Sequence, residues 1–304
     1  MNPFLCVYGH VALDHILTLE RFPPLNTSVD VVEKRRYFGG TAGNMATMAS
    51  AMGVPTAAVS YVGRDFPDDY REFMLVHGVI LDDLVEVEGE ETATVWVVSD
   101  RDHNQIAYVF QGAMSGMDRY PLRTGTAERS EWVHVCTGRP GYYLRLIERC
   151  RAFGKKIALD PAQEIHHIWT REEFRRALPD CDALFANRGE LEKAMAYMDA
   201  RRPQDLLEHV DMVVNTLGAG GSVVYTMGEV VAVPAARPER VVDTTGAGDA
   251  FRAGFYAGRY RGLGLKESAE VGNALASFVV EAKGGLSRVP SWEGVLGRAG
   301  SCTQ

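Results

Sequence analysis

The chain is 304 residues long, with 46% hydrophobic and 24% charged residues and a formal net charge of −8. This composition is ordinary for a globular protein, and we expect residues 1–304 to form one large α/β domain. The acidic balance, without a long basic run, argues against nucleic acid and anionic membranes as partners. Five scattered cysteines without a C-x-x-C pair favour reduced thiols in a cytoplasmic protein over a disulfide framework or a zinc site.

The N-terminal run 4–8 is continuously apolar and predicts a buried strand that ends at Gly9. His10 and Asp14 follow it closely, so they are candidates for a site at the end of that strand. Because a carboxylate can accept two hydrogen bonds, Asp14 suits a pair of neighbouring hydroxyl groups. A solvated loop aspartate is the alternative, and the spacing alone favours it.

Alternating apolar residues follow in segments 13–38, 92–99 and 105–110. They predict hairpin strands at about 12–38 and 91–112, inserted between α/β units. Residues 41–52 form an Ala/Met/Gly-rich run that predicts a helix buried on all sides. A buried amide such as that of Asn44 costs roughly 1–3 kcal/mol if it has no hydrogen bond, so it needs a ligand or neighbouring backbone as partner.

From residue 57 to residue 216, strand-like runs alternate with helical runs. This alternation predicts a doubly wound, mainly parallel sheet sandwiched by helices. Ligands of such sheets gather at the carboxyl ends of the strands. Four polar residues follow apolar runs at ends of this kind: Asp160, Asn187, Thr216 and Asp243.

Near the C-terminus, the stretch DTTGAGDAF at 243–251 leads into a helical run. Gly246, Ala247 and Gly248 are small and stand where the helix begins, so their backbone N–H groups and the helix dipole can hold an anion. Asp249 follows in the first turn, where its carboxylate can take a proton from a hydroxyl group. Together they indicate phosphoryl transfer, whereas an ordinary helix cap is the alternative.

The stretch GGTAGNMA at 39–46, taken with DTTGAGDAF, resembles the two signatures of the PfkB (ribokinase-like) family of sugar and nucleoside kinases. The resemblance covers essentially the whole chain. It implies a ribokinase-like fold, ATP as phosphate donor and Asp249 as general base. It also implies that Asp14, Asn44 and the Gly39–Gly40 backbone contact the acceptor. The hairpin strands would form a lid over the acceptor site, often also a dimer surface.

For the phosphate donor, the resemblance implies that Asn187 and Glu190 of the motif NRGE organise Mg²⁺ through its waters. The loop with Thr216, Gly218 and Gly221 resembles the family's donor-nucleotide loop, and the helix with Asn273 would border the adenine. Neither a P-loop nor a Rossmann fingerprint occurs.

A monovalent cation such as K⁺ is also part of the resemblance. It would lie near Asp243 and Thr245. Many relatives with such a site have a small hydroxyl residue where this chain has Arg288, and an arginine could replace the cation.

Three stretches, at 104–114, 160–163 and 251–255, resemble archaeal nucleoside kinases and actinobacterial adenosine kinases. They imply transfer to the 5′-hydroxyl of a ribonucleoside, with Tyr108, Val109 or Phe110 stacking on the base and His167 reaching its edge. Lid packing or a dimer contact is the alternative for each aromatic or apolar residue. A sugar kinase on the same scaffold and a nucleoside sensor without activity are the competing functions.

Overall fold

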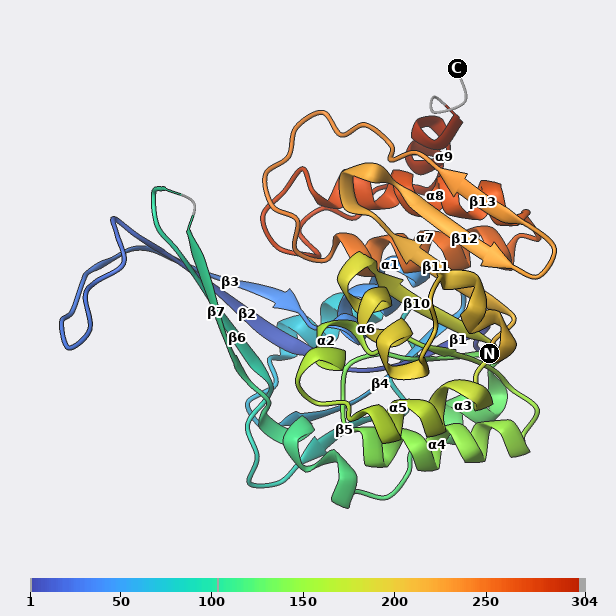
Figure 1. Ribbon diagram of the computed structural model, residues 1–304. Coiled ribbons are helices and arrows are strands. Elements are labelled where there is room, and N and C mark those ends of the chain that lie inside the picture. The colour runs from blue at the N-terminus through green and yellow to red at the C-terminus, as the bar shows by residue number, and fades with distance from the viewer. Residues whose placement is uncertain (1, 103, 301–304) are drawn as a thin grey trace.

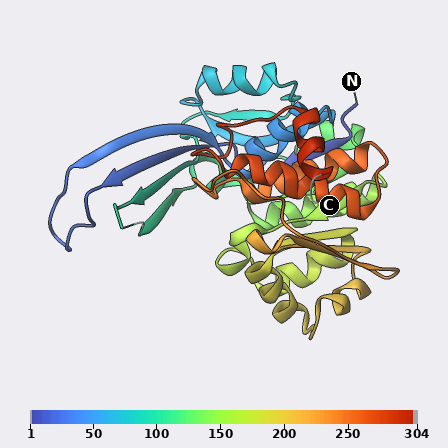
Figure 2. The same ribbon diagram turned by 90° about the horizontal axis from the view of Figure 1, so that it is seen from above.

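The computed structural model describes residues 2–102 and 104–300. A nine-stranded sheet forms its centre, helices cover both faces, and a four-stranded sheet projects from one side (Figures 1 and 2). This arrangement confirms the predicted doubly wound α/β fold with a separate small sheet.

The strands of the large sheet run in the order β13-β12-β11-β10-β9-β8-β1-β4-β5. All neighbours from β11 to β5 are parallel, and β12 and β13 are antiparallel additions at one edge. The chain order reverses between β1 and β8, and α/β proteins bind ligands at such a switch point. The strands are β1 (Leu5–Tyr8), β4 (Thr56–Gly63), β5 (Leu84–Val87), β8 (Trp132–Val135), β9 (Lys156–Leu159), β10 (Ala183–Asn187), β11 (Met212–Thr216), β12 (Ser222–Thr226) and β13 (Val230–Val233).

Two hydrophobic cores lie on the two faces of this sheet. Within β1, Leu5 and Val7 belong to one core and Cys6 and Tyr8 to the other, as the alternation of a strand requires. The first core is covered by α1 (Thr41–Ala51), α2 (Asp68–Val76), α7 (Ala247–Tyr260), α8 (Leu265–Val279) and α9 (Trp292–Gly300). The second is covered by α3 (Gly125–Arg129), α4 (Pro140–Ala152), α5 (Arg171–Ala177) and α6 (Arg188–Met198).

The small sheet has the order β3-β2-β6-β7. Its strands are β2 (Ala12–Leu19), β3 (Val31–Gly39), β6 (Thr94–Ser99) and β7 (Gln105–Phe110). The hairpins β2–β3 and β6–β7 are antiparallel, which agrees with the segments predicted at 12–38 and 91–112. Several of its apolar side chains are exposed, including Val32, Tyr108 and Val109.

One predicted strand end is wrong. Asp243 does not follow a strand, because β13 ends at Val233 and residues 234–246 form a loop. The valines before it, Val241 and Val242, are exposed. The loop is held instead by the carbonyl of Val280, which accepts from the N–H groups of Val242 (2.7 Å) and Asp243 (3.2 Å).

Four cysteines, Cys6, Cys136, Cys150 and Cys181, are free and buried, which confirms the prediction of reduced thiols for them. Cys302 lies outside the described residues. Of the helices that the structure describes, none combines the length and the apolar character needed to cross a bilayer.

Candidate active site

The N-terminus of α7 has backbone N–H groups that no protein group occupies among the described residues. Gly246 caps it in a left-handed conformation (φ 76°), without a side-chain cap. A Cβ at Gly246 would lie 2.7 Å from Cα of Gly285, so a larger residue would have to displace backbone. Among the described residues, the N–H groups of Gly248 and Asp249 have no hydrogen-bond partner. These N–H groups and the helix dipole can therefore receive a phosphoryl oxygen.

Asp249 lies beside this N-terminus and is held by α1. The amide of Asn44 donates to its Oδ2 at 2.8 Å. Burial raises the pKa of Asp249 to about 7, although the charge of Arg252 and the bond from Asn44 act in the opposite direction. A carboxylate with a pKa in this range can serve as a general base at neutral pH.

Asp14 faces the same space from β2. It is buried, and a Cβ at Gly39 would lie 2.2 Å from its Oδ2, so Gly39 allows the carboxylate to lie against β3. Burial raises the pKa of Asp14 to about 7, and the nearby charges of Asp249 and Asp243 add to the effect. The two carboxylates therefore belong to one site. The buried Oδ1 of Asn44 has no partner among the described residues, which leaves it available to an acceptor hydroxyl.

His10 links the end of β1 to the neighbouring strand ends. Its Nδ1 lies 2.7 Å from Oγ1 of Thr137, and its Nε2 lies 2.6 Å from Oε1 of Gln111, the residue after β7. Burial lowers the pKa of His10 to about 4, so the ring is neutral. Gly40 is close to it, because a Cβ there would lie 2.4 Å from the His10 carbonyl. Gln111 and Thr137 were missed from the sequence, although each directly follows a strand region.

Val109 and His167 are not brought into contact with this group by any described interaction. Val109 is 49% exposed on β7. His167 is exposed after the short helix η2 (Ala162–His166), and only its backbone N–H has a described partner, the carbonyl of Glu164 at 3.2 Å.

A cavity of about 500 Å³ lies on the other side of the α7 N-terminus. Its size is within the range of nucleotide-sized ligand pockets. Four residues predicted for the donor line it, namely Thr216, Gly218, Gly221 and Asn273, together with Ala247 and Gly248 of α7. The amide of Asn273 fixes the wall by donating to the carbonyls of Val233 (3.3 Å) and Pro234 (3.0 Å).

Asn187 and Glu190 form a capping box at the start of α6. Glu190 accepts from the backbone and the amide of Asn187, both at 2.7 Å, and donates its N–H to Asn187 Oδ1 at 3.0 Å. Both carboxylate oxygens thus have a protein donor and keep further lone pairs. This arrangement fits a Mg²⁺ ion held through its waters rather than bound directly.

Asp243 and Thr245 fit a K⁺ ion poorly. Oδ1 of Asp243 accepts from the N–H (2.9 Å) and hydroxyl (2.8 Å) of Thr245, and Oδ2 accepts from the N–H of Gly284 (2.9 Å). Arg288 is ion-paired with Glu281 rather than with Asp243. Both oxygens of this carboxylate therefore already accept hydrogen bonds from the protein, which leaves it poorly placed to ligate a K⁺ ion.

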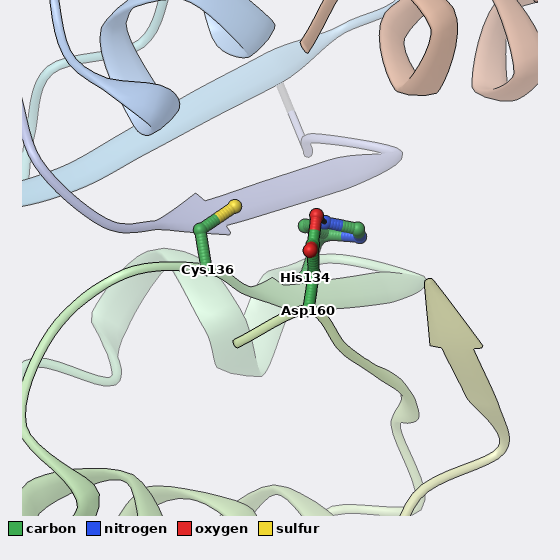
Figure 3. A group of neighbouring side chains, drawn as sticks. All are labelled: His134, Cys136 and Asp160. Carbon is green, nitrogen blue, oxygen red and sulfur yellow. Dashed lines mark hydrogen bonds and ion pairs between the residues drawn. The ribbon is translucent and has the colours of Figure 1, made fainter. Parts of the chain in front are cut away.

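His134, Cys136 and Asp160 form a buried cluster whose ligand atoms lie within 4.8 Å of one another (Figure 3). Burial raises the pKa of the Cys136 thiol and lowers that of His134, so both are neutral. Asp160 is ion-paired with Arg252 and bonded to His134. Because a guanidinium already occupies the carboxylate, this cluster is unsuited to a metal ion.

The family model of pfkB family carbohydrate kinases matches residues 2–292. A nucleoside kinase of Methanocaldococcus jannaschii is 35% identical over 300 residues, 98% of this chain and 97% of that protein. A nucleoside kinase of Methanothermobacter thermautotrophicus is 36% identical over 289 residues, 94% of this chain and 92% of that protein. The crystal structure of the M. jannaschii nucleoside kinase covers 99% of this chain and 100% of its own, with a TM-score of 0.91 and 33% identity. With two carboxylates beside an open helix N-terminus and a nucleotide-sized cavity behind it, the chain belongs to the PfkB family and is a phosphotransferase.

Proposed function

We propose that this protein is an ATP-dependent nucleoside kinase that phosphorylates the 5′-hydroxyl of a ribonucleoside. The observation that carries the proposal is the position of Asp14 and Asp249. Their carboxylates face one space, with the acceptor-side glycines on one side and the α7 N-terminus with its cavity on the other. The similarity to archaeal nucleoside kinases over nearly the whole chain supports a nucleoside as the acceptor.

In the proposed reaction, Asp14 accepts hydrogen bonds from the 2′- and 3′-hydroxyls and so positions the ribose. Asp249, held by Asn44, takes the proton of the 5′-hydroxyl. At the same time the oxygen of that hydroxyl group forms a bond to the γ-phosphorus of ATP. The bond between the γ-phosphorus and the bridging oxygen breaks, and ADP leaves. The free N–H groups of Gly248 and Asp249 stabilise the charge on the transferring group.

Mg²⁺, when bound, neutralises the charge of the donor phosphates. Asn187 and Glu190 would hold this ion through its waters. The adenine and ribose of ATP occupy the cavity lined by Thr216, Gly218, Gly221 and Asn273.

We assign the small sheet as a lid that excludes water from the acceptor, within a single domain. Val109 and His167 are proposed to contact the base once this lid closes. The exposed apolar side chains of the sheet make it a candidate homodimer surface, which sedimentation velocity would test. The reaction is proposed to take place in the cytoplasm, and cell fractionation would test this location.

A sugar-phosphate acceptor is disfavoured by the charges near the lid. Arg35 and Arg36 are the basic residues expected to bind such an acceptor. Both are exposed and already paired, Arg35 with Glu33 at 2.6 Å and Arg36 with Asp69 at 2.5 Å. Free sugars such as ribose or fructose remain the second candidate class, because the family model is that of carbohydrate kinases.

The test is ADP release with ATP and Mg²⁺ across adenosine, inosine, guanosine, cytidine, ribose, fructose and fructose 6-phosphate. Turnover confined to the nucleosides supports the proposal. Turnover confined to a sugar overturns the nucleoside assignment, and nucleoside binding without ADP release identifies a sensor. In the same panel, Val109→Ser and His167→Ala should change the ranking of the bases without changing the KM for ATP.

A further inference from the structure

A buried guanidinium lies directly beneath the anion site. Arg252 is in the second turn of α7 and is 6% exposed. A Cβ at Gly248 would lie 2.5 Å from its Nη1, so the guanidinium takes the space where a side chain of residue 248 would be. Arg252 follows Asp249 by three residues, which places both side chains on one face of the helix.

Asp160, which follows β9, holds this guanidinium in place. Its Oδ1 accepts from Nη2 of Arg252 at 2.7 Å, and its Oδ2 is ion-paired with Nε. His134 lies beside this carboxylate on β8, with its Nε2 3.1 Å from Oδ2 (Figure 3). The Nδ1 of the same ring lies 3.0 Å from the hydroxyl of Tyr256. Because Asp160 can only accept, Nε2 carries the proton of the neutral ring and the tyrosine donates to Nδ1.

Packing alone does not explain this arrangement. Removing two charges from water is costly, and replacing a buried ion pair by apolar side chains is often neutral or stabilising. Both partners are buried, Arg252 at 6% and Asp160 at 2% exposure, and the ring of Phe185 packs on His134 beside them with 5.2 Å between the ring centroids. The guanidinium of Arg252 lies beside the proposed reacting groups although its burial costs desolvation energy, and this points to a role in the reaction.

We propose that Arg252 is a positioning residue for phosphoryl transfer, whose guanidinium, clamped by Asp160 beneath Gly248, supplies the positive charge that Asp249 and the transferring phosphoryl group face. The proposal rests on the proposed kinase function. The ion pair would thus provide a fixed positive charge beside Asp249, which the neutral N–H groups of the α7 N-terminus do not provide.

The charges that face Asp249 come from several elements. Arg252 on α7 is the cation among the groups described as interacting with it. Against it stand the acidic groups of Asp160, Glu190 on α6 and Asp14 on β2. Tyr70 on α2 and Cys136 after β8 also face Asp249, and the pKa of each is raised well above its ordinary value, chiefly by burial.

The two partners of the ion pair are expected to act in opposite directions. Burial raises the pKa of Asp249, and Arg252 is the largest influence that lowers it. Removing the positive charge should therefore raise this pKa further, whereas removing the negative charge of Asp160 should lower it. A purely structural role would give both substitutions the same effect, a loss of activity that does not depend on pH.

The experiment is the pH profile of kcat/KM for the best nucleoside, measured for Arg252→Gln, Asp160→Asn and wild type. Arg252→Gln should move the acidic limb up by roughly one pH unit. At pH values below the pKa of Asp249, kcat/KM of this variant should then be about tenfold lower than that of wild type, and above pH 9 the difference should be much smaller. Asp160→Asn should move the limb down. Arg259→Gln is the matched control, since Arg259 lies exposed on the same helix and its guanidinium donates to the carbonyl of Leu263.

Unmoved limbs in both variants, with activity lowered equally at every pH, would overturn the proposal. If Arg252→Gln does not fold, Asp160→Asn decides by the direction of its shift, and Arg252→Lys should bring the limb back toward that of wild type. Titration of ¹³C-labelled aspartate carboxyls, with Asp249→Asn to assign the signal, measures the same shift without turnover. Wild-type protein that phosphorylates no nucleoside refutes the proposed function, whereas the carboxyl titration still tests Arg252.

Discussion

The N-termini of α1 and α7 are built alike but are used differently. Each helix begins after a glycine with positive φ, 86° at Gly40 and 76° at Gly246, and neither has a side-chain cap. At α1, the carbonyl of His10 accepts from the N–H groups of Ala42 (3.0 Å) and Gly43 (3.2 Å). At α7, the corresponding region keeps free N–H groups at Gly248 and Asp249, within the part of the chain that the structure describes.

Because of this difference, we expect the α1 end to contact the acceptor and the α7 end to bind the transferring phosphoryl group. The α1 end is closed by the β1–β2 connection, so its contribution to the acceptor is the amide of Asn44 and the space that Gly39 leaves for Asp14. The α7 end is open and carries Asp249, the proposed base, in its first turn. A glycine-started helix is therefore an anion site only where no neighbouring carbonyl occupies its donors.

The largest effect is expected from Asp249→Asn, which keeps the shape of the side chain but removes the proposed base. We expect kcat to fall by roughly 10²–10⁴, because general base catalysis contributes about that factor. Calorimetry should still detect nucleoside binding, since Asp14 and Asn44 are unchanged. A variant that keeps a kcat within about tenfold of wild type would show that another group takes the proton.

The two glycines test the separation of acceptor and donor functions. Gly39→Ala would push a Cβ into the carboxylate of Asp14, so the KM for the acceptor should rise by roughly 10–100-fold while the KM for ATP stays unchanged. Gly246→Ala would distort the open α7 turn, so kcat should fall by a similar factor.

Gly262→Ala is the control for both glycine variants. Gly262 also has positive φ (75°), but a Cβ there would meet no atom within 4 Å. Gly262→Ala should therefore lower the stability of the fold, because alanine disfavours a positive φ, but leave KM and kcat unchanged. Equal changes in KM and kcat for Gly39→Ala and Gly246→Ala would contradict the division between the two helix ends.

The smallest effect concerns stability. Burial raises the pKa of Asp14 from 3.8 to about 7 in the folded protein. The folded state therefore binds this proton more tightly than the unfolded chain, and its stability falls as the pH rises from about 4 to 7. Asp14→Asn should thus stabilise the fold, by roughly 1–3 kcal/mol at pH 8 and less at pH 5, as thermal unfolding at the two pH values can measure.

Asp199→Asn is the contrasting variant for this measurement. Asp199 is exposed, and its pKa is lowered by hydrogen bonds from Arg171 and Arg175. Its substitution should bring no stabilisation at pH 8. If Asp14→Asn also gives none, the ionised form of Asp14 is not disfavoured in the fold.

The sequence by itself determined the α/β alternation, the two hairpins of the small sheet and the glycine-rich start of α7. These features depend on neighbouring residues, namely apolar periodicity and small residues before a helix. The sequence also identified Asn44 as a buried amide that needs a partner, and that partner is Asp249.

Only the tertiary structure decided which groups meet across long separations. Asp243 follows valines that resemble a strand, yet these valines are exposed in a loop held by Val280. The pair of Arg252 and Asp160 joins residues 92 positions apart, and no local pattern specifies such a contact. The same holds for the open N-terminus of α7, because whether its N–H groups are free depends on which carbonyls the fold brings near them.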